Sequence, residues 1–171
     1  GLSWAGLPEI DGRGNAAAQF DFFAGLVTEI KGDTIPMGDG VINMSVREPY
    51  GVVGAILPWN APLNQAGRAC APALAAGNTV VVKPSEATSG SVLALARLLV
   101  GCGVPAGVFN VVTGVGVEAG EALVRHPDVR KIAFTGSLRA GQQIGRIAAD
   151  RVLPLTLQLG GKSPDIVFAD A

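Results

Sequence analysis

Charged residues are scarce in this chain of 171 residues, at 16% of the sequence against about 25% in typical globular domains. The deficit indicates surface that further protein normally covers. The formal net charge is only −1, so there is no electrostatic reason to expect binding to nucleic acid or to an anionic membrane. No apolar run approaches the roughly 18 residues that a membrane span needs. We therefore expect neither a nucleic-acid partner nor a membrane partner.

Cysteine and histidine are rarer still, with two and one residues respectively. Cys70 and Cys102 lie far apart and have no metal or redox spacing, so we expect no metal site and a reduced, cytoplasmic setting. Alanines flank Cys70, which is typical of a packed thiol rather than a reactive one. His126 falls in a loop and is interpreted as a surface residue. Residues 1–14 have neither a basic region nor an apolar core, so we expect no secretory signal.

Hydrophobic residues, at 49%, are plentiful enough for a buried core. Short β-branched runs end at proline or glycine, and amphipathic helix patterns lie between them. This alternation predicts an α/β fold, a Rossmann-like parallel sheet with helices on both faces. The runs cover residues 52–57, 79–83, 108–112 and 131–135, and the helix patterns cover 64–76, 89–100, 117–124 and 138–150.

The first part of the chain follows a different pattern. Apolar residues at helical spacing predict a helix over 15–30, ended by Gly32. After a turn at 37–40, the alternation over 42–46 predicts a strand. Residues 28–48 therefore predict a small antiparallel β arm whose open edge needs a partner.

Four loops follow the predicted strands, at 58–63, 83–86, 114–116 and 136–141. Doubly wound sheets bind ligands at the carboxyl ends of their strands. In the last loop, backbone amides at a helix start attract phosphate and Ser137 can add a hydroxyl donor. An ordinary turn with an N-cap serine is the alternative.

Lys83 and Glu86 could grip two ribose hydroxyls after the second strand. A carboxylate there would repel a 2′-phosphate, which favours NAD over NADP. The alternative is solvated charge in a loop.

Two amides stand out near predicted strand ends. The side chain of Asn60 is a neutral donor suited to a developing oxyanion, although a turn or helix cap would also explain it. Gln158 precedes two glycines; its amide can orient water but cannot take a proton at neutral pH.

Six ordered blocks resemble the aldehyde dehydrogenase superfamily. They are PWNAPL at 58–63, APALAAGNT at 71–79, KPSE at 83–86, GVFNVVTG at 107–114, FTGS at 134–137 and LGGKSP at 159–164. The resemblance extends from the helix near Asn15 to the last residue. It implies oxidation of an aldehyde to a carboxylic acid with NAD or NADP, through attack by a cysteine, hydride transfer to the nicotinamide and hydrolysis of a thioester.

The resemblance also implies roles for individual residues. Asn60 matches the oxyanion-stabilising asparagine, and Gln158 stands where the family has its glutamate base. The arm at 28–48 matches the part used in oligomer contacts, which implies a homodimer or homotetramer. The implied cofactor contacts are Ile56, Trp59, Lys83, Ser85, Glu86, Gly116, Gly136, Ser137, Gly141, Leu159 and Gly160.

Three departures from the family pattern shape the expectation. The nucleophilic cysteine is expected beyond Ala171, and an N-terminal portion of the usual fold is expected before Gly1. Residues 1–171 are therefore interpreted as a partial NAD(P)-binding domain with an incomplete aldehyde dehydrogenase fold. By itself this domain is expected to be inactive and to bind NAD weakly. Gln158 replaces a carboxylate, and Ala69 stands where many members have a lysine. The alternative is a catalytically inactive nucleotide-binding or structural remnant of the same fold. A different oxidoreductase on the same sheet would have no need of the blocks around Asn60 and Lys162.

Overall fold

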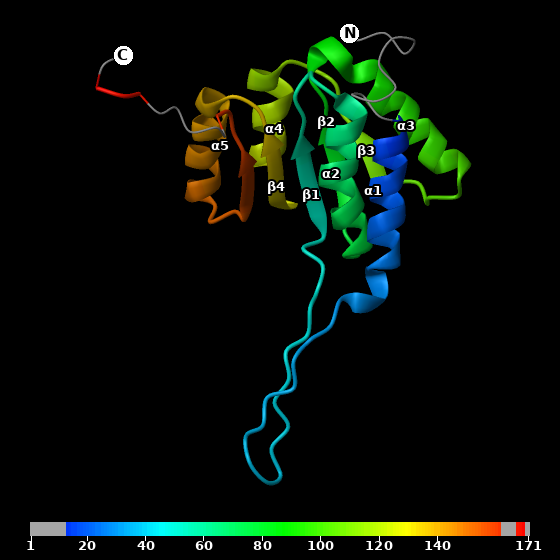
Figure 1. Ribbon diagram of the computed structural model, residues 1–171, viewed down its shortest axis with the longest axis vertical. Helices are drawn as coiled ribbons and strands as arrows, with labels where there is room; N and C mark the ends of the chain where they lie inside the picture. Colours follow the sequence, from blue (N-terminus) through cyan, green and yellow to red (C-terminus); the bar gives the residue numbers. More distant parts are fainter. Residues whose placement is uncertain (1–12, 162–166, 170–171) are drawn as a thin grey trace.

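A five-stranded, fully parallel sheet forms the centre of the computed structural model, which describes residues 13–161 and 167–169 (Figure 1). The strand order is β3-β2-β1-β4-β5. The predicted α/β fold is confirmed, with helices on both faces of the sheet. The strands are β1 Val52–Ile56, β2 Thr79–Lys83, β3 Phe109–Val111, β4 Val129–Thr135 and β5 Leu155–Gln158.

Helices connect consecutive strands, as parallel pairing requires. In Figure 1, α1 and α2 lie side by side, and α5 lies next to β5. Val27–Glu29 and Glu86–Thr88 are single 3-10 turns, and Gly116–Gly120 is a π-helical turn before α4. The α-helices are α1 Arg13–Gly25, α2 Pro62–Ala75, α3 Ser89–Gly101, α4 Glu121–Arg125 and α5 Leu138–Asp150.

Two hydrophobic cores lie on opposite faces of the sheet, because successive side chains of a strand point to opposite sides. Val53 and Ala55 of β1 face the core that α1, α2 and α3 cover. Ile56 faces the core that α4 and α5 cover. β1 is therefore buried on both faces, which explains its unbroken apolar run. A Cβ at Gly54 would lie 2.6 Å from Cδ1 of Ile132, so this glycine leaves room for the side chains of Ile132 and Leu123 over the sheet.

The N-terminal region differs from its prediction in two ways. The helix ends at Gly25, not near Gly32, and a single 3-10 turn follows; glycine is a poor helix former because ordering it costs the most backbone entropy. The alternation over 42–46 does not give a regular strand. Residues 31–47 instead form a ribbon with one antiparallel bridge, between Thr34 and Met44. A two-stranded ribbon whose apolar side chains are exposed buries little surface, so its pairing stays minimal.

The ribbon extends away from the body of the molecule (Figure 1). Backbone hydrogen bonds hold its two sides together, from Ile35 N to Asn43 O at 2.9 Å and from Ser45 N to Asp33 O at 2.8 Å. Its apolar side chains are exposed, as Ile42 illustrates at 82%. The predicted role of residues 28–48 in oligomer contacts stays a prediction.

Candidate functional site

The strand order reverses direction next to β1, and this creates a crevice. The chain proceeds from β1 outward to β3, then returns to place β4 on the other side of β1. The connections on the two sides therefore cover opposite faces and diverge at the carboxyl ends of β1 and β4. In open α/β sheets this is where ligands bind. The loops that contain Asn60, Lys83, Ser137 and Gly160 all follow carboxyl ends at this edge.

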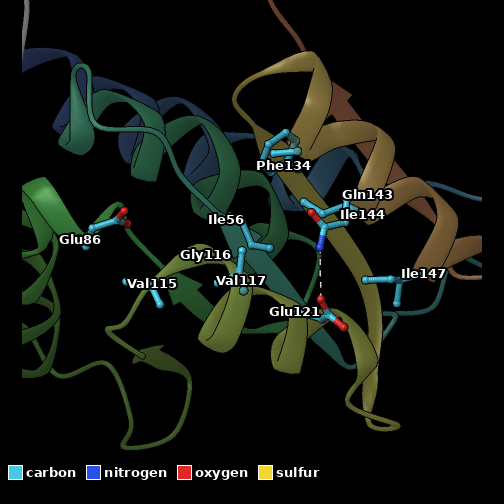
Figure 2. Close-up of a pocket in the computed structure, with 12 residues that line it drawn as sticks. Ile56, Glu86, Val115, Gly116, Val117, Glu121, Phe134, Gln143, Ile144 and Ile147 are labelled. Atoms are coloured by element: carbon cyan, nitrogen blue, oxygen red, sulfur yellow. Dashed lines mark hydrogen bonds between the residues drawn. The ribbon is translucent and has the colours of Figure 1, made fainter.

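A cavity of about 300 Å³ opens at this position, on the face that α4 and α5 cover. We call it the apolar cavity. Figure 2 shows Glu86 on one side of it and Gln143, Ile144 and Ile147 of α5 on the other. Its lining consists of Ile56, Glu86, Val115, Gly116, Val117, Gly120, Glu121, Phe134, Ala140, Gln143, Ile144 and Ile147.

The structure thus brings Ile56, Glu86 and Gly116 together among the predicted cofactor residues. It adds a stripe of α5 that the sequence reasoning missed: Ala140, Gln143, Ile144 and Ile147. These residues recur at helical spacing, so the amphipathic pattern over 138–150 contained the signal. Gln143 is held in place by a 3.2 Å hydrogen bond from its Nε2 to Oε2 of Glu121 (Figure 2).

Lys83 and Glu86 form an ion pair at the rim of the apolar cavity. Nζ of Lys83 lies 3.4 Å from Oε2 of Glu86. The lysine side chain is 3% exposed and the glutamate side chain 60%. The pKa of Glu86 is lowered, first by a hydrogen bond from its own backbone amide and then by the hydrogen bond and charge of Lys83. Glu86 is therefore a carboxylate at neutral pH, fixed by Lys83 and accessible to a ligand. Ser85 Oγ accepts a hydrogen bond from Ala87 N at 3.4 Å, which caps the following turn.

The start of α5 lies at the cavity rim as well. Ser137 is its N-cap, and Oγ accepts a hydrogen bond from Ala140 N at 3.3 Å. The capping alternative is thus present in the structure, and the hydroxyl proton of Ser137 remains available to a second acceptor. Gly136 N donates to Gln158 O at 3.1 Å, which joins this turn to β5. A Cβ at Gly141 would overlap Cδ2 of Leu159, so Gly141 and Leu159 meet as a packing pair.

Eight of the eleven predicted cofactor residues do not line the apolar cavity itself: Lys83, Ser85, Gly136, Ser137 and Gly141, described above, and also Trp59, Leu159 and Gly160. Trp59 is 64% exposed, Gly160 is exposed, and Leu159 packs against the core under α5. Their contact with a cofactor stays a prediction.

The side chain of Asn60 makes no hydrogen bond to any described residue. The N-cap of α2 is Ala61, in left-handed conformation with φ 47°, and it makes no side-chain capping bond. Asn60 is exposed, and within the described ranges no partner accepts from or donates to its amide. The helix-cap interpretation of Asn60 is therefore wrong at this position. Its two amide donors are free to serve a ligand.

Gln158 lines a second hollow, of about 150 Å³, on the face of the sheet that carries α2. We call it the polar hollow. Ala69 lines it too, so the two positions at which the resemblance implies a glutamate and a lysine share one space. Thr135 contributes a hydroxyl from the end of β4.

The two cysteines are poor candidates for a nucleophile. Burial raises the pKa of Cys70 to about 12, so its thiolate form is negligible at neutral pH; the packed role predicted for it is confirmed. Cys102 is exposed, but it follows α3, which runs from the carboxyl edge back to the opposite edge of the sheet.

The described residues contain neither a cluster of metal-binding side chains nor a helix that could span a membrane. Among residues 13–161 and 167–169, no three His, Cys, Asp or Glu side chains group in a way that could hold a metal ion. None of the described helices combines the length and apolar character needed to cross a membrane.

Comparison with known proteins places the chain in one family. Residues 9–171 match the model of the aldehyde dehydrogenase family. Hydroxyisobutyraldehyde dehydrogenase of Mycolicibacterium austroafricanum is 50% identical over 151 residues, which cover 88% of this chain and 30% of the relative. The crystal structure of a putative aldehyde dehydrogenase from Burkholderia cenocepacia is 50% identical, with a TM-score of 0.86 over 91% of this chain and 33% of that one.

A third comparison concerns a structure with a bound cofactor. The NAD+ complex of aldehyde dehydrogenase from Bacillus cereus is 44% identical, with a TM-score of 0.86 over 91% of this chain and 32% of that chain. The chain spans about 30% of the length of the curated relatives it matches. Sequence, fold and these similarities lead to one assignment: the chain belongs to the aldehyde dehydrogenase family.

Proposed function

We propose that this chain forms the dinucleotide-binding part of an oxidoreductase that oxidises an aldehyde to a carboxylic acid with NAD+. The observation that supports it most directly is the apolar cavity at the point where the strand order reverses, with the Lys83–Glu86 pair at its rim. The aldehyde substrate and the activity belong to the proposal, because the chain spans only about 30% of its relatives.

The chemistry of the cavity fits a dinucleotide. Ile56, Val117 and Ile144 offer apolar surface to the adenine ring. Glu86 can accept hydrogen bonds from the ribose hydroxyls, with Lys83 beside it. The amides at the start of α5 and the hydroxyl of Ser137 suit the pyrophosphate. Bound there, the cofactor would supply the hydride acceptor.

The carboxylate of Glu86 favours NAD over NADP. A 2′-phosphate carries about 1.5 to 2 negative charges at neutral pH, and it would approach a side chain that the lowered pKa keeps ionised. Like charges in this position are repulsive, so NADP is expected to bind less tightly than NAD.

We assign Asn60 as the amide donor to the developing oxyanion and Gln158 as a residue that orients water without accepting its proton. Attack on the aldehyde would need a cysteine outside residues 1–171, because Cys70 is buried and Cys102 follows α3 at the far edge. In a longer protein with such a cysteine, loss of a general base typically costs about 10²–10⁴-fold. Gln158→Glu is therefore expected to speed thioester hydrolysis; an unchanged rate would show that another base serves.

The cofactor proposal is tested by titrating the chain with NAD and NADP and following binding by calorimetry. We expect saturable NAD binding with a dissociation constant above the micromolar range. Glu86→Gln is expected to weaken NAD binding roughly tenfold, because it removes charge-assisted hydrogen bonds. The same variant should also reduce the preference for NAD over NADP. Glu29→Gln, on an exposed turn remote from the cavity, is the matched control. Equal affinity of the Glu86→Gln variant and the unchanged chain would contradict the assignment.

Gln158 also favours a second candidate, a nucleotide-binding or structural remnant without the chemistry. The two candidates separate in a longer protein that carries the nucleophile: turnover of an aldehyde supports the enzyme, and NAD binding without turnover supports the remnant. We also propose that residues 28–48 make the subunit contacts of a homodimer or homotetramer. The proposed location is the cytoplasm.

A further inference from the structure

The polar hollow has an unusual set of polar side chains. Five of its lining residues can donate hydrogen bonds from their side chains, and none of its lining residues is acidic. The donors come from three elements: α2, the end of β4, and β5. The lining consists of Leu57, Gln65, Arg68, Ala69, Ala133, Phe134, Thr135, Thr156 and Gln158.

Arg68 brings a positive charge to the hollow, and no described residue forms an ion pair with it. In the part of the chain that the structure describes, ion pairs form at Glu29, Glu86 and Glu121, and none involves Arg68. The guanidinium also has no hydrogen-bond acceptor among those residues. It therefore presents five donors in a planar fork, a geometry that matches a carboxylate.

Thr156 is polarised toward donation. Nζ of Lys131 donates to Oγ1 of Thr156 at 3.1 Å, so one acceptor position of that hydroxyl is occupied while its proton remains free for another partner. Lys131 itself has no carboxylate partner within the described ranges and lies 5.4 Å from the ring centre of Tyr50. A second positive charge thus lies behind the hydroxyl that lines the hollow.

Gln158 determines the sign of the charge in this space. A glutamate at this position would give the hollow a carboxylate of its own and a partner for Arg68. The amide leaves the described lining of the hollow with cationic and neutral donors only, a set that is complementary to an anionic ligand.

We propose that the polar hollow binds a small carboxylate, through Arg68 and the donors of Thr135, Thr156 and Gln158. Its volume of about 150 Å³ equals that of roughly five water molecules in the liquid, which suits a short carboxylate. Two sources share this chemistry: the acid that the proposed reaction forms, and an acid group carried by the aldehyde itself. The link to the reaction rests on the proposed function, whereas binding of the anion does not.

The test is a titration of the isotopically labelled chain with sodium propionate, followed by two-dimensional NMR. Sodium chloride at the same ionic strength controls for salt, and propionamide controls for shape without charge. We expect saturable shifts at Thr135, Thr156 and Gln158 with propionate alone. Arg68→Gln is expected to weaken binding about tenfold or more, since it removes the charge-assisted bonds. Arg146→Gln, an exposed arginine on α5 across the sheet, is the matched control.

Two further variants guard against a folding artefact. Gln158→Glu places a carboxylate beside Arg68 and is expected to lower the propionate affinity. Because the glutamine and glutamate side chains have nearly the same size, this variant should not disturb the packing of the hollow. Thr156→Val removes one donor and is expected to give a smaller loss. Absence of saturable shifts, or affinities that Arg68→Gln and Gln158→Glu leave unchanged, would overturn the proposal.

The source of the carboxylate is resolved by repeating the titration with 4-oxobutanoate, an aldehyde that carries an acid group. Tighter binding of propionate supports the product, and tighter binding of 4-oxobutanoate supports the substrate. Because NAD is absent from these titrations, their failure would not affect the cofactor proposal. Failure of NAD to bind, in turn, would leave the carboxylate site in place.

Discussion

The apolar cavity and the polar hollow share strands but lie on opposite faces of one sheet. Ile56 lines the first and Leu57 the second; Phe134 reaches both, and Thr135 only the polar hollow. The difference follows from the alternation of side chains along a strand. Consecutive residues at a strand end can therefore serve two spaces of different chemistry.

The two spaces also depend on different forces. The apolar cavity is bounded by side chains of a packed core, so its shape depends on the close packing of that core. The polar hollow is bounded by donors at a partly exposed edge, so its properties depend on charge. Changes in the walls of the apolar cavity should thus affect stability, and changes in the lining of the polar hollow should affect reactivity and anion binding.

The largest expected difference concerns two neighbouring residues of α2. Ala69 lines the polar hollow, whereas Cys70 is fully buried with a pKa of about 12. At pH 8 about one Cys70 thiol in 10⁴ is ionised, and only the thiolate reacts. In a Cys102→Ser background, we expect a cysteine introduced by Ala69→Cys to react with iodoacetamide about 10³-fold faster than Cys70, as read by mass spectrometry. Similar rates would mean that the boundary between hollow and core is not where the structure places it.

The next largest effect separates the two faces by stability. Ile132 is completely buried under α4 and α5. Ile132→Ala is expected to lower the free energy of unfolding by about 2–5 kcal/mol, because it leaves a cavity. Thr156→Val, in the polar hollow, is expected to change it by less than about 0.5 kcal/mol. Urea denaturation measures both. A loss at Ile132 no larger than that at Thr156 would contradict the distinction between the packed core under α4 and α5 and the polar hollow.

Two glycines of α5 sharpen the description of the packed face. A Cβ at Gly141 would overlap Leu159, whereas a Cβ at Gly145 would meet nothing within 4 Å. Gly145→Ala is expected to stabilise the chain by up to about 1 kcal/mol through helix propensity. Gly141→Ala is expected to destabilise it by about 1 kcal/mol, since overpacking outweighs that gain.

The control for this pair is the double variant with Leu159→Ala. Removal of the side chain that the new Cβ would meet should recover part of the loss, and a double-mutant cycle measures the coupling. Independent, additive effects would show that Gly141 and Leu159 do not pack together.

The smallest effect lies in the turn between α5 and β5. Val152 has φ 51° and is 90% exposed, a left-handed conformation that costs a residue with a Cβ about 1–2 kcal/mol. Val152→Gly is expected to raise the free energy of unfolding by roughly 0.5–1 kcal/mol after the entropy of glycine is counted. Val152→Ala, which keeps the Cβ, should gain less. Equal stability of all three chains would exclude strain at this position.

The parts predicted most accurately from the sequence are those with a single dominant signal. Residues 79–83 form β2 because an unbroken β-branched run has few other stable arrangements, and 138–150 form α5 because Ser137 caps a strongly amphipathic segment. β5 escaped prediction, since Thr156 and Gln158 are polar and the strand lies at an edge. Its identity depends on pairing with β4, which no local pattern contains.

The candidate site was predictable in its loops more than in its walls. Glu86 and Gly116 were expected to contact a cofactor, but Gln143 and Ile147 come from a helix in which no residue after Gly141 was predicted to contact one. Asn60 shows the converse: local sequence allowed a cap, and only the backbone of Ala61 excluded it. Which side chain meets which depends on how strand order brings separate segments together.

The ribbon of residues 31–47 has a consequence for how the chain is held together. It is the covalent route from α1 to β1, while α1 packs directly against α2. A protease cut at the exposed turn that holds Gly38 and Gly40 would leave α1 attached through noncovalent contacts and the bridge alone. The association of α1 with α2 would then be bimolecular and would depend on the concentration of the two pieces, because the chain no longer sets an effective concentration. The two pieces would dissociate on dilution.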